Sequence, residues 1–133
     1  MTTPETPAWD WSRAIFDHVH LRVADLAASR AFYAEVLEPL GIPLLLDAPH
    51  LLGFANLAIS ADGPVSSNVH VAFTAADRAA VDAFHAAGLA AGHRDNGAPG
   101  VRDYGPPGMT WYAAYLLDPD GNNIEAVHRS FGA

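Results

Sequence analysis

The stretch around His18 returns, at a constant offset, around His70. The matched pairs are His18 with His70, Val19 with Val71, Ala24 with Ala76, Asp25 with Asp77, Ala28 with Ala80 and Phe32 with Phe84. A row of matches in one register indicates an internally duplicated domain. Each copy carries a histidine at the equivalent place, so the duplication constrains both the fold and the position of any chemistry.

The first copy begins with a run that alternates between apolar and ionisable residues. The apolar set is Val19, Leu21 and Val23, and the ionisable set is His18, His20 and Arg22. In a strand, successive side chains point to opposite faces. We therefore expect a strand with an apolar back and a face of groups that can ionise or coordinate a metal.

The remaining signals give the order βαβββ twice. We expect strands over 14–24, 43–46 and 51–59, helices over 26–40 and 77–88, a repeat strand over 69–76, and a hairpin of 111–117 and 122–128. Asp25 and Asp77 are suitable N-caps for the two helices. The segment 96–108 is rich in glycine and proline, and we expect it to be a long irregular loop with at most a short strand.

This order predicts an α+β domain of two pseudo-symmetric βαβββ modules that form a curved, cup-shaped mixed sheet with the helices outside. The single domain covers 1–133, with module one at about 14–62 and module two at about 66–129. Residues 1–12 are expected to be an N-terminal arm, whose tryptophans cover an exposed edge or a partner subunit. Pseudo-symmetry would bring His18 and His70 to facing positions.

Composition excludes several classes of function. The chain has 133 residues, a formal charge of −8 and seven scattered basic residues, so neither nucleic acid nor an anionic membrane is an expected partner. It has no cysteine, which excludes disulfides, thiolate catalysis and cysteine-bound zinc. No apolar run approaches a membrane span, and the N-terminus does not resemble a signal peptide. A cytoplasmic protein is the expectation.

Glu125 is the most unusual acidic residue. It follows Ile124 and precedes Ala126 and Val127 in an apolar hairpin, and burial of a carboxylate is costly unless it is paired or bound to metal. Two imidazoles and one carboxylate on three strands can hold a divalent metal and leave positions open for substrate. His18, His70 and Glu125 are therefore the candidate metal ligands, although Glu125 facing water is the alternative.

Two segments also carry a family resemblance. The run from Phe16 to Leu26, followed by Ser29 and Ala31-Phe32-Tyr33, resembles the opening motif of the vicinal oxygen chelate superfamily. The run from Tyr115 to Glu125, with Asp118-Pro119-Asp120-Gly121 at its turn, resembles the closing motif. This superfamily includes glyoxalase I, extradiol dioxygenases, fosfomycin-modifying thiol transferases and bleomycin-binding proteins. The resemblance implies the paired βαβββ fold and a metal on His18, His70 and Glu125.

The resemblance also bears on neighbouring residues. Glyoxalase I is expected to have a fourth ligand, a glutamate at the end of the first half, where the best match here is the neutral Asn56. Two histidines and one glutamate are instead similar to the sets of extradiol dioxygenases and fosfomycin-modifying enzymes. Tyr115 resembles a tyrosine that hydrogen-bonds substrate in the dioxygenases, with a packed core aromatic as the alternative. Asn56 remains a candidate for binding substrate.

Two further candidates share the face of His18. His20 is a candidate catalytic residue, with a position behind the metal or simple packing as alternatives. Arg22 is a candidate to bind a substrate carboxylate or phosphonate, because its guanidinium matches such groups with two hydrogen bonds. Its alternative is an ion pair with Glu125 or Asp25. No role is assigned to the remaining histidines, which are His50, His85, His93 and His128.

These observations favour an enzyme that uses one divalent metal (Fe, Mn, Ni or Zn) and acts on a small substrate with adjacent oxygens. A non-catalytic protein that binds small molecules of antibiotic type on the same fold is the alternative, and a structural dimer module is a third possibility. A homodimer is expected from the resemblance, with modules pairing either within one chain or between chains.

Overall fold

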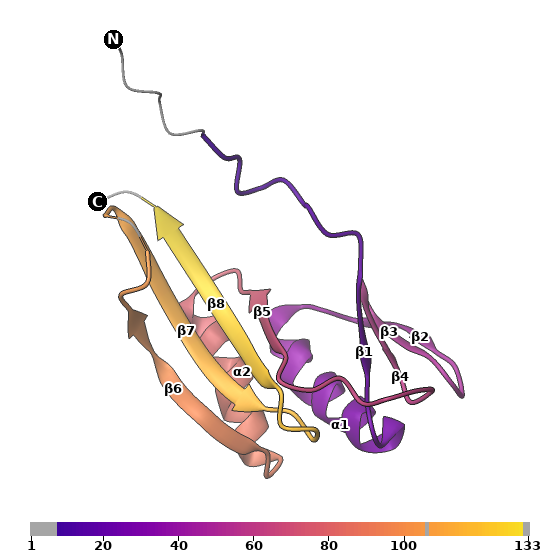
Figure 1. The fold of residues 1–133 in the computed structure, drawn as a ribbon. Coiled ribbons are helices and arrows are strands. Elements are labelled where there is room, and N and C mark those ends of the chain that lie inside the picture. Colours follow the sequence, from indigo (N-terminus) through magenta and orange to yellow (C-terminus); the bar gives the residue numbers. More distant parts are fainter. Residues whose placement is uncertain (1–7, 106, 132–133) are drawn as a thin grey trace.

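Each half of the chain folds into one four-stranded sheet and one long helix (Figure 1). The computed structural model describes residues 8–105 and 107–131. The elements are β1 (Val19–Arg22), α1 (Leu26–Leu37), the 3-10 helix η1 (Glu38–Leu40), β2 (Leu44–Asp47), β3 (Leu52–Phe54), β4 (Leu57–Ser60), β5 (His70–Thr74), α2 (Arg78–Ala90), β6 (Arg94–Arg102), β7 (Met109–Leu117) and β8 (Asn123–Phe131). This is the βαβββ order twice, which confirms the α+β class and the two modules.

The strand order is equivalent in the two sheets. Sheet one has the order β1-β4-β3-β2 and sheet two has β5-β8-β7-β6, so β1 and β5 are outer strands. β1 runs parallel to β4, and β5 runs parallel to β8. Within the described part of the chain no strand pairing joins the two sheets, and both remain open.

Both helices begin where the sequence predicts. The Asp25 side chain accepts a hydrogen bond from the backbone N–H of Ala28 at 3.1 Å, and Asp77 accepts one from Ala80 at 2.8 Å. These bonds satisfy N–H groups that have no partner inside the helix. The first helix ends in η1 and then Gly41, whose φ of 72° favours glycine.

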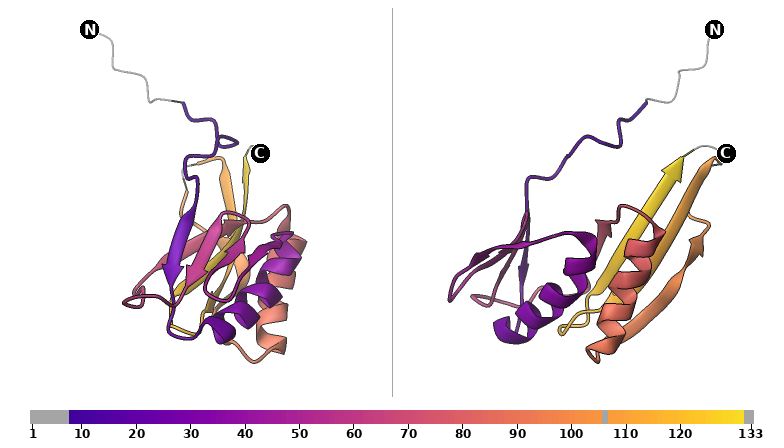
Figure 2. Two further views of the ribbon diagram at one scale, coloured as in Figure 1. Left: turned by 90° about the vertical axis from the view of Figure 1, so that its right-hand side faces the viewer. Right: turned by 180° about the vertical axis from the view of Figure 1, so that it is seen from behind.

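The modules meet through their helices. α1 and α2 lie side by side, each over its own sheet (Figures 1 and 2). Phe32 and Tyr33 of α1 belong to the same buried core as Phe84 of α2 and Ile124 of β8. A buried hydrogen bond from the Tyr33 hydroxyl to Asp118 Oδ2 (2.7 Å) also links α1 to the turn between β7 and β8. The apolar sides of both sheets therefore face this shared core, and their polar sides face away from it.

Three boundaries differ from the predictions. The first strand covers only Val19–Arg22 instead of 14–24, and the expected strand 51–59 is divided into β3 and β4 by a turn at 55–56. The predicted loop at 96–108 is wrong, because most of it belongs to the nine-residue strand β6. β6 is the outer strand of sheet two and its pairing with β7 shifts register twice. Outer strands and bulges tolerate proline and glycine, which explains how this composition forms a strand.

No helix among residues 8–105 and 107–131 has the length and apolar character needed to cross a membrane.

Candidate metal and substrate site

Glu125 forms the centre of a polar cluster on sheet two. It lies in β8 between Ile124 and Ala126, whose side chains are fully buried in the core, and it faces the opposite side of the sheet. Only 2% of Glu125 is exposed. Burial of this carboxylate is therefore observed, and the alternative that it faces water does not hold.

Two donors compensate the buried carboxylate. His70 Nε2 lies 2.7 Å from Glu125 Oε1, and Trp111 Nε1 donates to Oε2 at 3.0 Å. A carboxylate can only accept, so His70 donates its Nε2–H here. The strand register brings these groups together. Ala72 of β5 is paired with Glu125, and His70, two residues before Ala72, lies on the same face of the sheet. The sequence predicted His70 and Glu125 as metal ligands together with His18, and the structure brings these two side chains together.

Tyr115 belongs to the same cluster. It pairs directly opposite Glu125 across β7 and β8, and its ring centroid lies 6.3 Å from that of His70. Burial, the Tyr104 hydroxyl and the Glu125 carboxylate, in that order of effect, raise the pKa of Tyr115. The phenol therefore keeps its proton at neutral pH and is a hydrogen-bond donor beside the buried carboxylate.

His18 lies apart from this cluster. It comes just before β1, its side chain is 66% exposed, and its Nδ1 lies 2.8 Å from Asp17 Oδ2. No group of three His, Cys, Asp or Glu side chains with metal-binding geometry occurs among residues 8–105 and 107–131. One chain therefore assembles two of the three predicted ligands and leaves His18 on the other module.

His20 is held by a chain of hydrogen bonds on sheet one. Its Nε2 lies 2.6 Å from Ser60 Oγ, and Ser60 Oγ donates to Asp62 Oδ1 at 2.6 Å. The Ser60 hydrogen bond, offset partly by burial, lowers the pKa of Asp62, so Asp62 is an ionised acceptor. Ser60 then accepts from His20 Nε2–H, which orients the ring and leaves Nδ1 as its second polar atom.

Arg22 pairs with the same acid. Its Nε lies 3.3 Å from Asp62 Oδ1, and both side chains are partly exposed. Arg22 therefore forms an ion pair, which was the alternative to substrate binding, but its acid is Asp62 and neither Glu125 nor Asp25. Since exposed ion pairs contribute little to stability, Arg22 remains available to an anionic ligand.

The register also identifies the equivalent of Glu125 in module one. In sheet two Ala72 is paired with Glu125, and in sheet one His20, two residues after His18, is paired with Ala58. The corresponding position is therefore Ala58 and not Asn56. Asn56 lies exposed in the β3–β4 turn, and its carbonyl accepts from the Val19 N–H at 3.0 Å. Alanine offers no ligand, so a site of the four-ligand type lacks its fourth protein group here.

The histidines without a predicted role have local contacts or lie in a turn. His85 Nε2 lies 2.9 Å from Asp95 Oδ1, His93 Nε2 lies 3.6 Å from Glu35 Oε2, His128 Nδ1 lies 3.2 Å from the Ala75 carbonyl, and His50 is exposed.

Sequence reasoning missed Trp111, Ser60 and Asp62. Trp111 shares the face of Tyr115, and the hairpin register would have pointed to it once its turn was placed. Ser60 and Asp62 lie beyond the predicted end of the strand 51–59, so nothing in the pattern connected them with His20.

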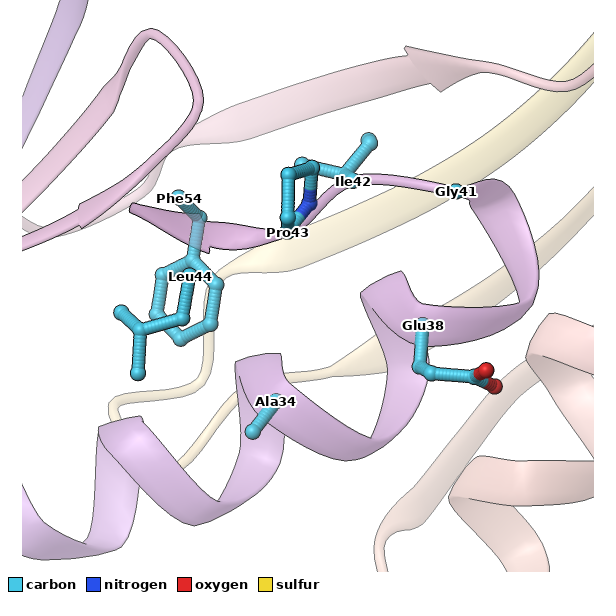
Figure 3. A pocket seen from close by; sticks show the side chains of 7 residues that line it. All are labelled: Ala34, Glu38, Gly41, Ile42, Pro43, Leu44 and Phe54. Carbon is cyan, nitrogen blue, oxygen red and sulfur yellow. The ribbon is translucent and has the colours of Figure 1, made fainter. Parts of the chain in front are cut away.

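One apolar hollow lies away from this chemistry. It is lined by Ala34, Glu38, Gly41, Ile42, Pro43, Leu44 and Phe54, and has a volume of about 320 Å³ (Figure 3). It lies between α1 and β2–β3, on the core side of sheet one, whereas His18 and His20 are on the other side. Glu38 is its only ionisable side chain, so it carries no candidate chemistry.

Comparison with solved structures decides the family. A glyoxalase/bleomycin resistance protein from Albidiferax ferrireducens T118 is 35% identical, matches 87% of this chain and 100% of its own, and superposes with a TM-score of 0.72. The chain belongs to the glyoxalase/bleomycin resistance family of the vicinal oxygen chelate superfamily.

Other solved structures share the fold at lower identity. A lactoylglutathione lyase from Agrobacterium tumefaciens is 23% identical over 87% of this chain and 94% of its own, with a TM-score of 0.62. A glyoxalase from Bacillus halodurans, described as putative, is 22% identical over 89% of this chain and 98% of its own, with a TM-score of 0.65. No protein-family model and no curated protein matches the chain.

Proposed function

We propose that this glyoxalase-family protein is an enzyme that uses one divalent metal and acts on a small substrate with two adjacent oxygens. The observation that carries the proposal is the buried Glu125 carboxylate, 2.7 Å from His70 on the polar face of sheet two. A carboxylate and an imidazole at this distance can turn to a common cation. Fe, Mn, Ni and Zn all accept this donor set.

His70 and Glu125 would hold the metal, with His18 of a second copy as the third ligand. His18 is exposed and its Nδ1–H is directed to Asp17, which leaves Nε2 for coordination. When bound, the metal supplies a Lewis acid for the paired oxygens of the substrate.

Two side chains would handle protons and charge. Tyr115 keeps its proton and can donate a hydrogen bond to a substrate oxygen beside Glu125. His20 is placed to exchange a proton at Nδ1, and the bond to Ser60 backed by Asp62 supports the positive charge of its protonated form. Arg22 and Asn56 remain candidates to bind polar groups of the substrate.

A homodimer by exchange of modules would complete this site. β1 and β5 are outer strands, and among the described residues no further strand pairs with either outer edge, although Ser66 hydrogen-bonds to the backbone of Arg22. Residues that flank β1 expose apolar side chains, with 63% of Ile15 and 67% of Phe16 exposed. Pairing β1 of one copy with β5 of another would cover these edges and bring His18 toward His70 and Glu125. We therefore propose a dimer in which each site takes residues from both chains.

Metal content tests the proposed function. The protein purified without chelator should carry one equivalent of metal per chain by elemental analysis. His18→Ala, His70→Ala and Glu125→Gln should each lose it, whereas His50→Ala, which removes an exposed histidine in a turn, should not. Wild-type protein that neither carries nor takes up Fe, Mn, Ni or Zn would contradict the proposal.

Mixing two inactive variants tests the exchange. A dimer of one His18→Ala chain and one His70→Ala chain contains one intact site if each site draws on both chains, because that site takes His18 and His70 from different copies. Metal binding should therefore reappear after the two variants are unfolded and refolded together. If sites form within single chains, every site in the mixture lacks one ligand and no binding returns.

The alternative is a binding protein without catalysis. One observation favours it: only two of the candidate ligands converge within one chain, and Ala58 occupies the fourth position. This alternative predicts protein that lacks bound metal and yet retains affinity for small molecules.

A further inference from the structure

A second feature of sheet two lies farther along β8 from Glu125. Arg129 faces the same side of the strand, and its guanidinium carbon lies 4.3 Å from the ring centroid of Trp11 and 4.2 Å from that of Trp111. Trp11 comes from the N-terminal arm, whereas Trp111 is directly paired with Arg129 across β7 and β8. The Arg129 guanidinium therefore contacts two indole rings, Trp111 from the hairpin and Trp11 from the N-terminal arm.

Among the described residues, the Nε–H of Arg129 has no acceptor. Its Nε is buried and has no hydrogen-bond partner in the part of the chain that the structure describes, and no acid there pairs with the guanidinium. Stacking on an indole uses the flat face of the guanidinium and leaves the N–H groups at its edge. Buried donors without partners are costly, so this arrangement is suited to an acceptor that comes from outside.

A cavity of about 400 Å³ lies beside these groups. Its lining runs from Ala72, which is paired with Glu125, past Thr74 and Val127 to Trp111, Arg129 and Phe131. Most of this lining is apolar, and the volume is in the range of cavities that hold small ligands. The cavity therefore extends from Ala72, the strand neighbour of Glu125, to the Arg129 cation, and neither His70 nor Glu125 lines it.

We infer that Arg129 is the anchor for an anionic group of the substrate, and that the substrate has a flat apolar body ending in a carboxylate or phosphonate. Arg129 lies four positions after Glu125, which is about 13 Å at about 3.3 Å per residue of strand. The apolar body lies over Val127 between the indoles and Ala72. The anion accepts two hydrogen bonds from the edge of the guanidinium.

The negative net charge of the chain means that binding an anion requires a local cation such as Arg129. The chain carries a formal charge of −8, which repels anions in general. An anionic substrate therefore requires a specific cation in the cavity, and Arg129 is placed to supply it. Trp111 connects both ends, because its Nε1 donates to Glu125 while its ring stacks on Arg129.

The inference rests on the proposed function for the end of the substrate that carries the paired oxygens, and on the cavity alone for the anionic end. The anionic end is therefore tested without metal. We would measure binding of phenylacetate and of its uncharged analogue phenylacetamide to the full chain in EDTA, by calorimetry and by tryptophan fluorescence. Phenylacetate should bind at least about tenfold more tightly, because only it can accept charge-assisted hydrogen bonds from Arg129.

Variants assign the effect to one side chain. Arg129→Gln should remove the preference for phenylacetate, and Arg129→Lys should keep part of it. Arg78→Gln is the matched control, because Arg78 also stacks on an aromatic ring, that of Tyr112 at 4.9 Å, but does not line the cavity. Unfolding curves of each variant separate a loss of binding from a loss of fold.

Each outcome decides the inference. Equal affinity for the two probes, or unchanged preference in Arg129→Gln, would overturn it, even if the protein binds metal. A preference that depends on Arg129 would support it even if no metal binds, and in that case the proposed metal chemistry alone would fail.

Discussion

The two modules have the same order of elements but contribute differently to the candidate site. Module two holds His70 and Glu125 in direct contact on a sheet whose strands β7 and β8 have nine residues each. Module one has strands of three or four residues and places Ala58 where module two has Glu125. Conversely, His20 of module one occupies the position of Ala72.

The two copies of the duplicated fold therefore contribute different chemical groups to the candidate site. Both copies keep the repeated histidine, which is His18 just before β1 and His70 at the start of β5. Only module two retains a buried carboxylate beside it, with Trp111 to satisfy the second oxygen. Module one instead holds a second histidine, His20, on the buried hydroxyl of Ser60. In this interpretation module two binds the metal and module one contributes a ligand and a group that moves protons.

Exchanging the carboxylate between modules should give the largest effect. Glu125→Gln should weaken binding of Ni²⁺ or Zn²⁺ at least about 100-fold, because even residues behind a ligand contribute 10- to 100-fold. Ala58→Glu places a carboxylate at the equivalent position of module one and should tighten binding about tenfold, which corresponds to about 1.4 kcal/mol. Calorimetric titration of chelator-treated protein measures both.

Ala58→Gln is the control for this exchange, because it has the same shape without the charge. If Ala58→Glu and Ala58→Gln bind metal equally, the position does not face the metal and the equivalence drawn from strand register fails.

The helices offer a second comparison. Tyr33 of α1 and His85 of α2 occupy equivalent positions of the repeat, and each bonds to an aspartate. Asp118, the partner of Tyr33, is 1% exposed and also accepts from Asn122, whereas the Asp95 side chain is 52% exposed. The first bond joins the two modules in the core, and the second remains within module two, between a buried imidazole and a half-exposed carboxylate.

Tyr33→Phe should therefore destabilise the fold by about 1–3 kcal/mol, because it removes a hydrogen bond to a buried carboxylate. Tyr112→Phe is the matched control: it removes an exposed hydroxyl bond to Asp82 and should change stability by less than about 0.5 kcal/mol. Chemical denaturation followed by circular dichroism measures both. If both variants lose the same free energy of unfolding, the buried hydrogen bond between the modules contributes no more to stability than the exposed one.

The sequence was sufficient for the parts of the fold that repeat. The register of His18 with His70, and the caps Asp25 and Asp77, predicted the duplicated βαβββ order. It did not place the fourth position, because the turn at 55–56 shifts the register and Ala58 has no chemical signal of its own. Nor did it find β6, because the glycine and proline that an outer strand tolerates are the residues that usually mark a loop.

Contacts between residues that are distant in the sequence also could not be predicted from the sequence pattern. His20 meets Ser60 across a parallel strand pair, and Trp11 meets Arg129 from opposite ends of the chain. Periodicity gives the face on which a side chain lies but not its partner on another element. Whether His18 joins His70 also depends on how copies associate, which is a property of the surfaces of two chains.

The peripheral bond of His85 should show the smallest effect and a dependence on pH. The His85 hydrogen bond, with that from the Gly97 N–H, lowers the pKa of Asp95 below its usual 3.8. A carboxyl group with a lowered pKa in the folded state stabilises the protein above its unfolded pKa, and the contribution is lost as pH falls through the folded value. Asp95→Asn should therefore lower the unfolding temperature slightly at pH 7, and the difference from wild type should shrink below about pH 3.8.

Asp103→Asn removes an exposed charge and should follow wild type at every pH. A constant difference between Asp95→Asn and wild type down to pH 2 would show that the ionised carboxylate is not what His85 stabilises. The His85–Asp95 hydrogen bond would then stabilise the fold independently of the charge on Asp95.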